Sequence, residues 1–301
     1  MGSPVAEKLH AAGHKVLGLA RSDVAAEKLQ HQGIEAHRGD LLDSVSIAAG
    51  VRIADAVINL AMLGSSGENF DADVAFPTDQ AAAETIIAAL NGSGKPFIHT
   101  SGAMVVADLA HGNANEQVFD EDTPLNPPDF MVLRAKTEHF VLAAAKRGDT
   151  HSIVLRPSHV YGRGGSFLVP QLLKFACKLG VSAYINEGAN KLSVVHVDDL
   201  ADLYVLALER APVGEIYNAE SFEVTMKEVA VAVSYAVGLG GATQSWTMEE
   251  AREKWTPDFT LFAATNERIT AAKARKQLGW KPQMLSLLKD IEHGSYRQLV
   301  G

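Results

Sequence analysis

Short apolar runs alternate with longer amphipathic stretches over the first half of the chain. Val5, Leu9 and Ala12 share one face of a helix. Pro4 suits the first turn of this helix, and Gly13 suits its end. Runs rich in valine and isoleucine are typical of buried parallel strands. The pattern predicts strands over residues 15–19, 34–37, 56–61, 96–100 and 152–156, and helices over residues 4–12, 24–32, 78–90 and 131–146.

The second half of the chain has a looser pattern. It predicts helices over residues 167–179, 200–209, 226–237 and 285–299, and strands over residues 192–197 and 214–218. Asp198 is expected to cap the helix over residues 200–209. The strand–helix alternation favours an α/β fold, a doubly wound and mainly parallel sheet with helices on both faces. We expect residues 1–160 to form the main domain and residues 161–301 a smaller mixed lobe, interwoven with the sheet.

Composition narrows the class of protein. The 301 residues are 47% hydrophobic and 21% charged, which is enough apolar material for a core and excludes global disorder. A net charge of -9 without a basic run argues against nucleic-acid binding. The single cysteine, Cys177, fits a reducing compartment, and no apolar run has the length of a signal peptide or membrane span. We therefore expect a cytoplasmic protein that binds neither nucleic acid nor membrane.

Seven short segments carry a family resemblance, through their order and spacing over nearly the whole chain. They are residues 12–16 (AGHKV), 38–41 (RGDL), 57–61 (VINLA), 100–102 (TSG), 156–162 (RPSHVYG), 195–201 (VHVDDLA) and 278–282 (LGWKP). Together they resemble the extended and atypical short-chain dehydrogenase/reductases, the broad family of NAD-dependent epimerases and dehydratases. The resemblance implies a Rossmann-type dinucleotide domain in residues 1–160 and a substrate lobe in residues 161–301. It also implies an NAD(P)-dependent oxidoreductase or epimerase/dehydratase for a small carbonyl, alcohol or sugar-like substrate.

The same resemblance implies that the start of the dinucleotide domain is missing. A Rossmann site needs a strand, a glycine-rich turn and a helix whose N-terminus faces the pyrophosphate. Gly2 matches only the last of the three glycines, unless it is merely the residue after the first methionine. We expect an N-terminally truncated chain without the first, central strand. The strands over residues 15–19 and 56–61 should then flank a slot, or the sheet should be rearranged.

The end of the strand over residues 15–19 bears on the choice of cofactor. Arg21 lies 19 positions after Gly2, close to where a carboxylate would bind the ribose of NAD. An arginine can instead form two hydrogen bonds to the 2′-phosphate of NADP. We predict that NADP is preferred over NAD, with Ser22 as a second phosphate contact. The alternative is a solvated arginine at a strand end.

The resemblance implies further contacts with the dinucleotide. Asp40 and Leu41 match the residues beside the adenine ring. Leu60 and Ala61 match the wall beside the ribose and nicotinamide. Two more residues implied to lie near the nicotinamide are Pro157 and His159.

The catalytic set that the resemblance implies is incomplete. Ser101 follows the strand over residues 96–100 and would polarise the substrate oxygen, while Lys136 matches the lysine that holds the nicotinamide ribose. The family's tyrosine stands four residues before this lysine, on the same helix face. Val132 occupies that position and cannot move a proton. Tyr161 is therefore the candidate acid, with a packing role as the alternative.

Three interpretations remain open at this stage. Catalysis persists with another acid, Tyr161 or His159; or the protein is a non-catalytic dinucleotide-binding sensor or scaffold; or it is an inactive family member. The resemblance implies a small-molecule substrate and a homodimer through the helices over residues 78–90 and 131–146. The histidines show no metal-ligand spacing, so no metal is expected.

Overall fold

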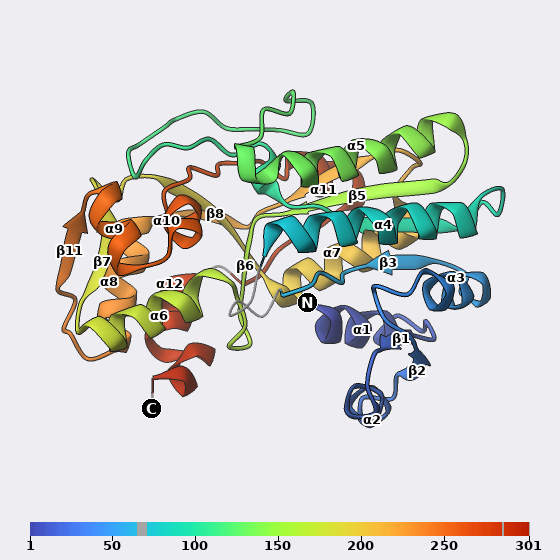
Figure 1. Ribbon diagram of the computed structural model, residues 1–301, viewed down its shortest axis with the longest axis horizontal. Coiled ribbons are helices and arrows are strands. Elements are labelled where there is room, and N and C mark those ends of the chain that lie inside the picture. Colours follow the sequence, from blue (N-terminus) through green and yellow to red (C-terminus); the bar gives the residue numbers. More distant parts are fainter. Residues whose placement is uncertain (65–70, 285, 301) are drawn as a thin grey trace.

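The structure, a computed structural model, describes residues 1–64, 71–284 and 286–300. Its centre is a parallel four-stranded sheet in the order β3-β4-β5-β9 (Figure 1). The strands of this sheet are β3 (Val57–Asn59), β4 (Pro96–Thr100), β5 (His151–Pro157) and β9 (Ile216–Ala219). Side chains such as Phe97, Ile98 and Ile153 are fully buried, as the apolar runs predict for a sheet covered on both faces.

Helices cover both faces of this sheet. One layer consists of α3 (Ser44–Ile53), α4 (Ala72–Leu90) and α5 (Val132–Arg147). The opposite layer consists of α1 (Gly2–Ala11), α7 (Val197–Arg210) and α11 (Ala272–Leu278). Because helices lie on both sides of parallel strands, the predicted doubly wound α/β class is confirmed.

A separate pair of parallel strands lies beside β3. It consists of β1 (Leu17–Ala20) and β2 (Glu35–Arg38), with α2 (Asp23–His31) packed on it. Among the described residues, β1 is bonded only to β2 and β3 only to β4. The predicted interruption of the sheet between these strands is therefore confirmed, with one edge of β1 and one edge of β3 unpaired within the part of the chain that the structure describes.

The second half of the chain builds a mixed lobe. Its two small sheets have the orders β10-β8-β6 and β11-β7. The strands are β6 (His159–Tyr161), β7 (Ser182–Ile185), β8 (Lys191–His196), β10 (Phe222–Thr225) and β11 (Thr243–Trp246). The helices are α6 (Leu168–Leu179), α8 (Met226–Ala236), α9 (Met248–Lys254), α10 (Pro257–Ala263) and α12 (Leu287–His293). Short 3₁₀ turns are η1 (Ala103–Val105), η2 (Asp129–Met131) and η3 (Ser295–Leu299).

Several element boundaries differ from the predicted ones for local reasons. The helix predicted from residue 78 begins at Ala72, where Asp71 caps it and Pro77 lies inside it. The closing helix ends at His293, because the chain turns at Gly294, and residue 285 lies outside the described residues. The helix after β8 begins at Val197 and is capped by the His196 ring, not by Asp198.

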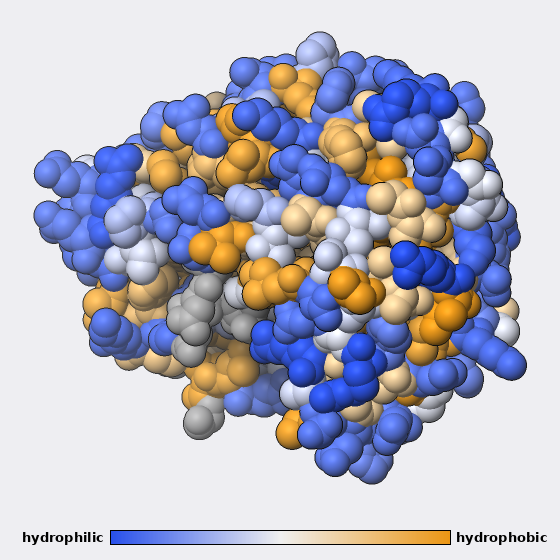
Figure 2. Space-filling model, turned by 45° about the vertical axis from the view of Figure 1, so that its right-hand side comes forward, coloured by the Kyte–Doolittle hydropathy of each residue, from blue (hydrophilic) through white to orange (hydrophobic). Residues whose placement is uncertain are grey.

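Large apolar side chains are exposed mainly in the first part of the chain. They include Leu19, Val24, Leu42, Val45 and Ile53, each 42–75% exposed. On the face shown in Figure 2, apolar residues lie in small groups between charged ones. The β1–β2 pair and its helices are thus less completely buried than the four-stranded sheet. None of the helices in the described ranges is long and apolar enough to cross a lipid bilayer.

Candidate functional site at the carboxyl ends of β4 and β5

The carboxyl ends of β4 and β5 bring two serine side chains to the same edge of the sheet. Ser101 follows β4, and its backbone N–H donates to the Leu155 carbonyl at 2.8 Å. Ser158 follows β5. Both side chains are buried, and neither hydroxyl has a hydrogen-bond partner among the described residues. Buried polar groups are normally paired, so these hydroxyls are available to a bound ligand. This edge is where ligands bind in open parallel sheets.

Arg134 of α5 fixes the chain at this edge. Its Nη2 donates to the carbonyls of Thr100 and Ser101, both at 2.8 Å. Its Nη1 lies 3.8 Å from Oδ2 of Asp79, and the other carboxylate oxygen, Oδ1, accepts from the Asn59 side chain at 3.0 Å. The arginine is 8% exposed. Sequence analysis missed Arg134 and Asp79, although charged residues on the inward faces of two apolar helices were a readable signal.

Lys136 lies on the other side of the same helix. Its side chain is exposed and lines a groove of about 410 Å³ with Pro127, Val132, His139 and Phe140. The helix therefore presents Arg134, and not Lys136, to the Ser101 carbonyl. The structure does not bring Ser101 and Lys136 into contact, and the predicted role of Lys136 stays a prediction.

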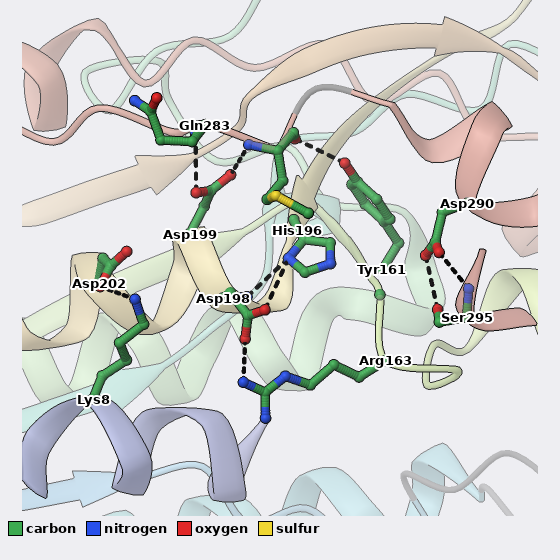
Figure 3. Close-up of polar contacts among 12 residues, drawn as sticks. Lys8, Tyr161, Arg163, His196, Asp198, Asp199, Asp202, Gln283, Asp290 and Ser295 are labelled. Carbon is green, nitrogen blue, oxygen red and sulfur yellow. Dashed lines mark hydrogen bonds and ion pairs between the residues drawn. The ribbon is translucent and has the colours of Figure 1, made fainter. Parts of the chain in front are cut away.

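Tyr161 lies in a polar cluster on the lobe side (Figure 3). Its hydroxyl donates to the Met284 carbonyl at 2.8 Å, and its ring meets His196 edge-on with centroids 5.1 Å apart. The side chain is 2% exposed, and burial raises the pKa of the phenol. Asp198 and Arg163 extend the cluster through an ion pair of 2.8 Å (Figure 3). These contacts hold the Tyr161 side chain in place, and its predicted role as the acid stays untested.

His159 of β6 has a buried partner that sequence analysis did not find. Its Nε2 lies 3.7 Å from a carboxylate oxygen of Glu267. Burial lowers the pKa of His159 to about 4 and raises the pKa of Glu267 well above its usual range. Pro157, the residue before Ser158, is buried at the end of β5. Glu267 could not be identified from the sequence, because only the tertiary fold brings it to β6.

The predicted adenosine contacts lie at the ends of β1 and β2. Gly2 begins α1, whose first turn has no side-chain cap, and a Cβ at Gly2 would meet open space. Arg21 follows β1 and is exposed, and the Ser22 hydroxyl caps α2 by accepting from the Ala25 N–H at 3.2 Å. Asp40 accepts from the Leu42 N–H at 2.9 Å. Leu41 is half-buried against α3 and α4.

Leu60 and Ala61 follow β3. Leu60 is half-buried, Ala61 is exposed, and the Ala61 N–H donates to the Asn59 side chain at 3.2 Å. An uncapped helix N-terminus, an exposed arginine and buried unpaired hydroxyls together suit a ligand with phosphates at one end and a polar ring at the other. The residues present therefore fit a dinucleotide. No group of three or more metal-ligating side chains occurs in the described ranges.

Known proteins are similar to this chain over most of its length. Residues 1–219 match the model of the NAD dependent epimerase/dehydratase family. An uncharacterized protein of Saccharomyces cerevisiae, YLL056C, is 32% identical over 97% of this chain and 94% of its own length. The 2-alkyl-3-oxoalkanoate reductase of Stenotrophomonas maltophilia is 26% identical over 99% of this chain and 94% of its own.

Solved structures share the fold. The UDP-glucose 4-epimerase of Thermus thermophilus, solved in complex with NAD, superposes with a TM-score of 0.74. The alignment covers 99% of this chain and 95% of that one, at 20% identity. The matched family is described as NAD dependent, and the Thermus thermophilus epimerase contains NAD.

Proposed function

Because the chain belongs to the NAD-dependent epimerase/dehydratase family, we propose that it is an NADP-dependent reductase of a small ketone. The family and its relatives support an NAD(P)-dependent oxidoreductase, epimerase or dehydratase in general. One observation supports the finer assignment: the buried Ser101 hydroxyl has no hydrogen-bond partner among the described residues. Placed at the end of β4, it can donate to a carbonyl oxygen. A full-length relative that is a 3-oxoalkanoate reductase supports the ketone.

The proposed roles follow from where each residue lies. The backbone N–H groups of Gly2 and Ser3, at the start of α1 where no side chain caps the helix, bind the pyrophosphate. Arg21 and Ser22 bind the 2′-phosphate, and Arg21 supplies its planar guanidinium. The remaining contacts with the dinucleotide are Asp40 and Leu41 at the adenine, Leu60 and Ala61 at the ribose, and Pro157 and His159 at the nicotinamide.

Chemistry takes place at the edge that holds Ser101. A bound NADPH supplies a hydride. Ser101 donates a hydrogen bond to the substrate oxygen and stabilises the negative charge that develops there. Arg134 keeps this serine in place through the carbonyls of Thr100 and Ser101. Lys136 lines the exposed groove on the other side of α5, away from this edge, so its predicted contact with the ribose is not part of the proposed site.

The first test uses ethyl acetoacetate, a 3-oxo ester, as the substrate. The oxidation of NADPH is measured as the loss of its absorbance. We expect Ser101→Ala to lower kcat by about 100-fold, the usual cost of losing one oxyanion donor. Ser44→Ala, on the exposed start of α3, is the matched control and should leave kcat unchanged. Unchanged turnover in Ser101→Ala contradicts the assigned role.

Val132 favours one other function, a sensor that binds the dinucleotide without turnover, because a valine stands where the family has its tyrosine. The same assay separates the two functions when NADPH binding is followed by fluorescence. Binding without oxidation over a panel of aldehydes, ketones and oxo esters supports the sensor. Turnover of any of them supports the reductase.

We also propose that the protein forms a homodimer through α4 and α5. The apolar groove along the outer face of α5 supports this, because an exposed apolar patch commonly marks a protein–protein interface. Its residues include Val132, Ala135, Phe140 and Ala143.

A further inference from the structure

Glu267 is a carboxyl group deep inside the molecule. It lies in the chain after α10 and pairs with β8 through its backbone. The Glu267 N–H donates to the Lys191 carbonyl at 2.8 Å, and the Ser193 N–H donates to the Glu267 carbonyl at 2.7 Å. The residue is 1% exposed. Carboxyl groups are seldom fully buried without a paired charge, so this position calls for a reason.

The surroundings of this carboxyl group lack a stable positive charge. The backbone N–H of His159 donates to it, and one of its oxygens, Oε1, has no hydrogen-bond partner among the described residues. The neighbouring cations form ion pairs with another residue, the exposed Glu116. Its Oε2 lies 3.3 Å from the Lys191 Nζ and 2.8 Å from the Arg268 Nη1. On the facing loop, the Asp108 carboxylate accepts from Asn115. Burial therefore raises the pKa of Glu267 well above its usual range and favours the protonated carboxyl group.

His159 is the one titratable side chain in an ion-pair distance of Glu267 among the described residues. Its side chain is 7% exposed, and burial keeps the imidazole neutral at pH 7. Its Nε2 has no hydrogen-bond partner in the described part of the chain. Phe262 meets the ring edge-on at 5.0 Å, and Phe167 packs on Phe262 at 4.7 Å. Phe262, itself packed on Phe167, thus holds the imidazole beside the carboxyl group.

This pair borders the proposed reaction site. Ser158, with its unpaired hydroxyl, immediately precedes His159. Phe262 also packs against the cluster that contains Ala103 and Val105, in the turn directly after Ser101. A Cβ built on Gly102 would lie 4.0 Å from the Pro157 carbonyl, so the two strand ends are close. The pair therefore lies next to the chain segments that directly follow β4 and β5.

We propose that the Glu267–His159 pair supplies the proton for the reduction, with Glu267 as the donor and His159 as the residue that positions it. The proposal rests on the proposed function. The hydride forms the new C–H bond as the carbonyl π bond breaks, and the oxygen takes the Glu267 proton to form the O–H bond. Glu267 becomes a carboxylate, which water reprotonates after the products leave. A neutral carboxyl group thus takes the place of the tyrosine that Val132 excludes.

The closing experiment combines infrared spectroscopy with turnover. We expect the spectrum of the wild type minus Glu267→Gln at pH 7, without any ligand, to show the C=O stretch of a carboxylic acid. With ethyl acetoacetate and NADPH, Glu267→Gln should lower kcat by about 100-fold or more, the usual contribution of a general acid. Glu223→Gln is the matched control, since the exposed Glu223 pairs with Arg268 next to Glu267 and lies outside the site.

A second variant covers the case in which Glu267→Gln does not fold. His159→Gln keeps the carboxyl group but not the ring that positions it, so it should lower kcat and move the alkaline limb of the pH profile. A residue that serves packing alone would change the melting temperature and leave that limb in place.

The outcomes are distinguishable. A carboxylic-acid band in the difference spectrum, together with loss of turnover in Glu267→Gln, supports the proposal. A missing acid band in the wild-type difference spectrum, or full activity in Glu267→Gln, overturns the donor role and leaves the reductase assignment intact. Absence of turnover in the wild type overturns the reductase assignment and the donor role with it, while the acid band still reports the protonation of Glu267.

Discussion

At the scale of single residues, Arg21 decides the expected choice of nucleotide. It is exposed at the end of β1, and hydrogen bonds to a charged group contribute about 1.5–3 kcal/mol. We therefore expect Arg21→Asp to weaken NADPH binding by at least tenfold and to change NADH binding much less, as measured by fluorescence titration. Lys28→Asp, on the exposed side of α2, is the charge-matched control. Equal losses for both nucleotides would falsify the assignment.

His159 should make stability depend on pH in a defined direction. Burial lowers its pKa to about 4, below the ordinary value of 6.5, so the unfolded chain takes up a proton that the folded chain refuses. This contribution to stability is complete above pH 6.5 and is lost as the pH falls toward 4. Relative to His159→Gln, the wild type should lose on the order of 3 kcal/mol over that range.

Urea unfolding at a series of pH values measures this difference. Glu267 acts in the opposite direction, because its raised pKa favours folding at low pH, so both proteins are compared with Glu267→Gln also present. His31→Gln, exposed at the end of α2, should follow the wild type. A constant difference between the wild type and His159→Gln contradicts the prediction.

Some residues of the site could be predicted from the sequence, and others could not. Ser101 and Arg21 follow strands whose apolar runs are plain, so chain position alone predicted their places. Arg134 and Glu267 could not be assigned in this way. Which face of α5 turns inward, and which loop reaches β6, depends on packing between segments far apart in the chain.

At the scale of elements, apolar runs predicted the strands of the four-stranded sheet well. β4 has the predicted bounds, and the other strands of that sheet differ by a few residues. The helix α3 was not predicted, partly because Gly50 lies within it. A Cβ at Gly50 would lie 2.9 Å from the His37 ring, so close contact with β2 explains a residue that is unfavourable in helices. β10 and β11 are short and lack a clear alternation.

The unpaired edge of β1 should be visible in hydrogen exchange. β1 is bonded on one side among the described residues, whereas β4 is bonded on both and is fully buried at Phe97 and Ile98. Strands with fewer bonds open at lower free energy. We expect the amides of β1 to exchange well before those of β4 in a mass-spectrometric experiment at neutral pH. β5, paired on both sides, is the internal reference, and equal protection of β1 and β5 contradicts the prediction.

At the scale of the whole molecule, the proposed dimer puts the outer face of α5 at an interface. We expect a dimer in analytical ultracentrifugation, which Ala143→Arg should dissociate by placing a charge in the groove. Ala49→Arg, on the exposed face of α3, makes the same change away from the groove and should leave the dimer intact. A wild-type monomer at all protein concentrations contradicts the proposal.

The β1–β2 pair and the four-stranded sheet are not bonded to each other among the described residues, so a bound nucleotide would connect them. Arg21 follows β1, and Ser101 follows β4. A ligand that contacts both residues therefore connects two sheets that share no backbone hydrogen bonds among the described residues. Its affinity then includes the entropy lost when their relative motion stops. NADPH should slow the hydrogen exchange of β1. Adenosine 2′,5′-bisphosphate, which would contact the β1–β2 pair but not the four-stranded sheet, should slow it much less. Substitutions between these two sheets should therefore lower nucleotide affinity without changing the reaction step at Ser101.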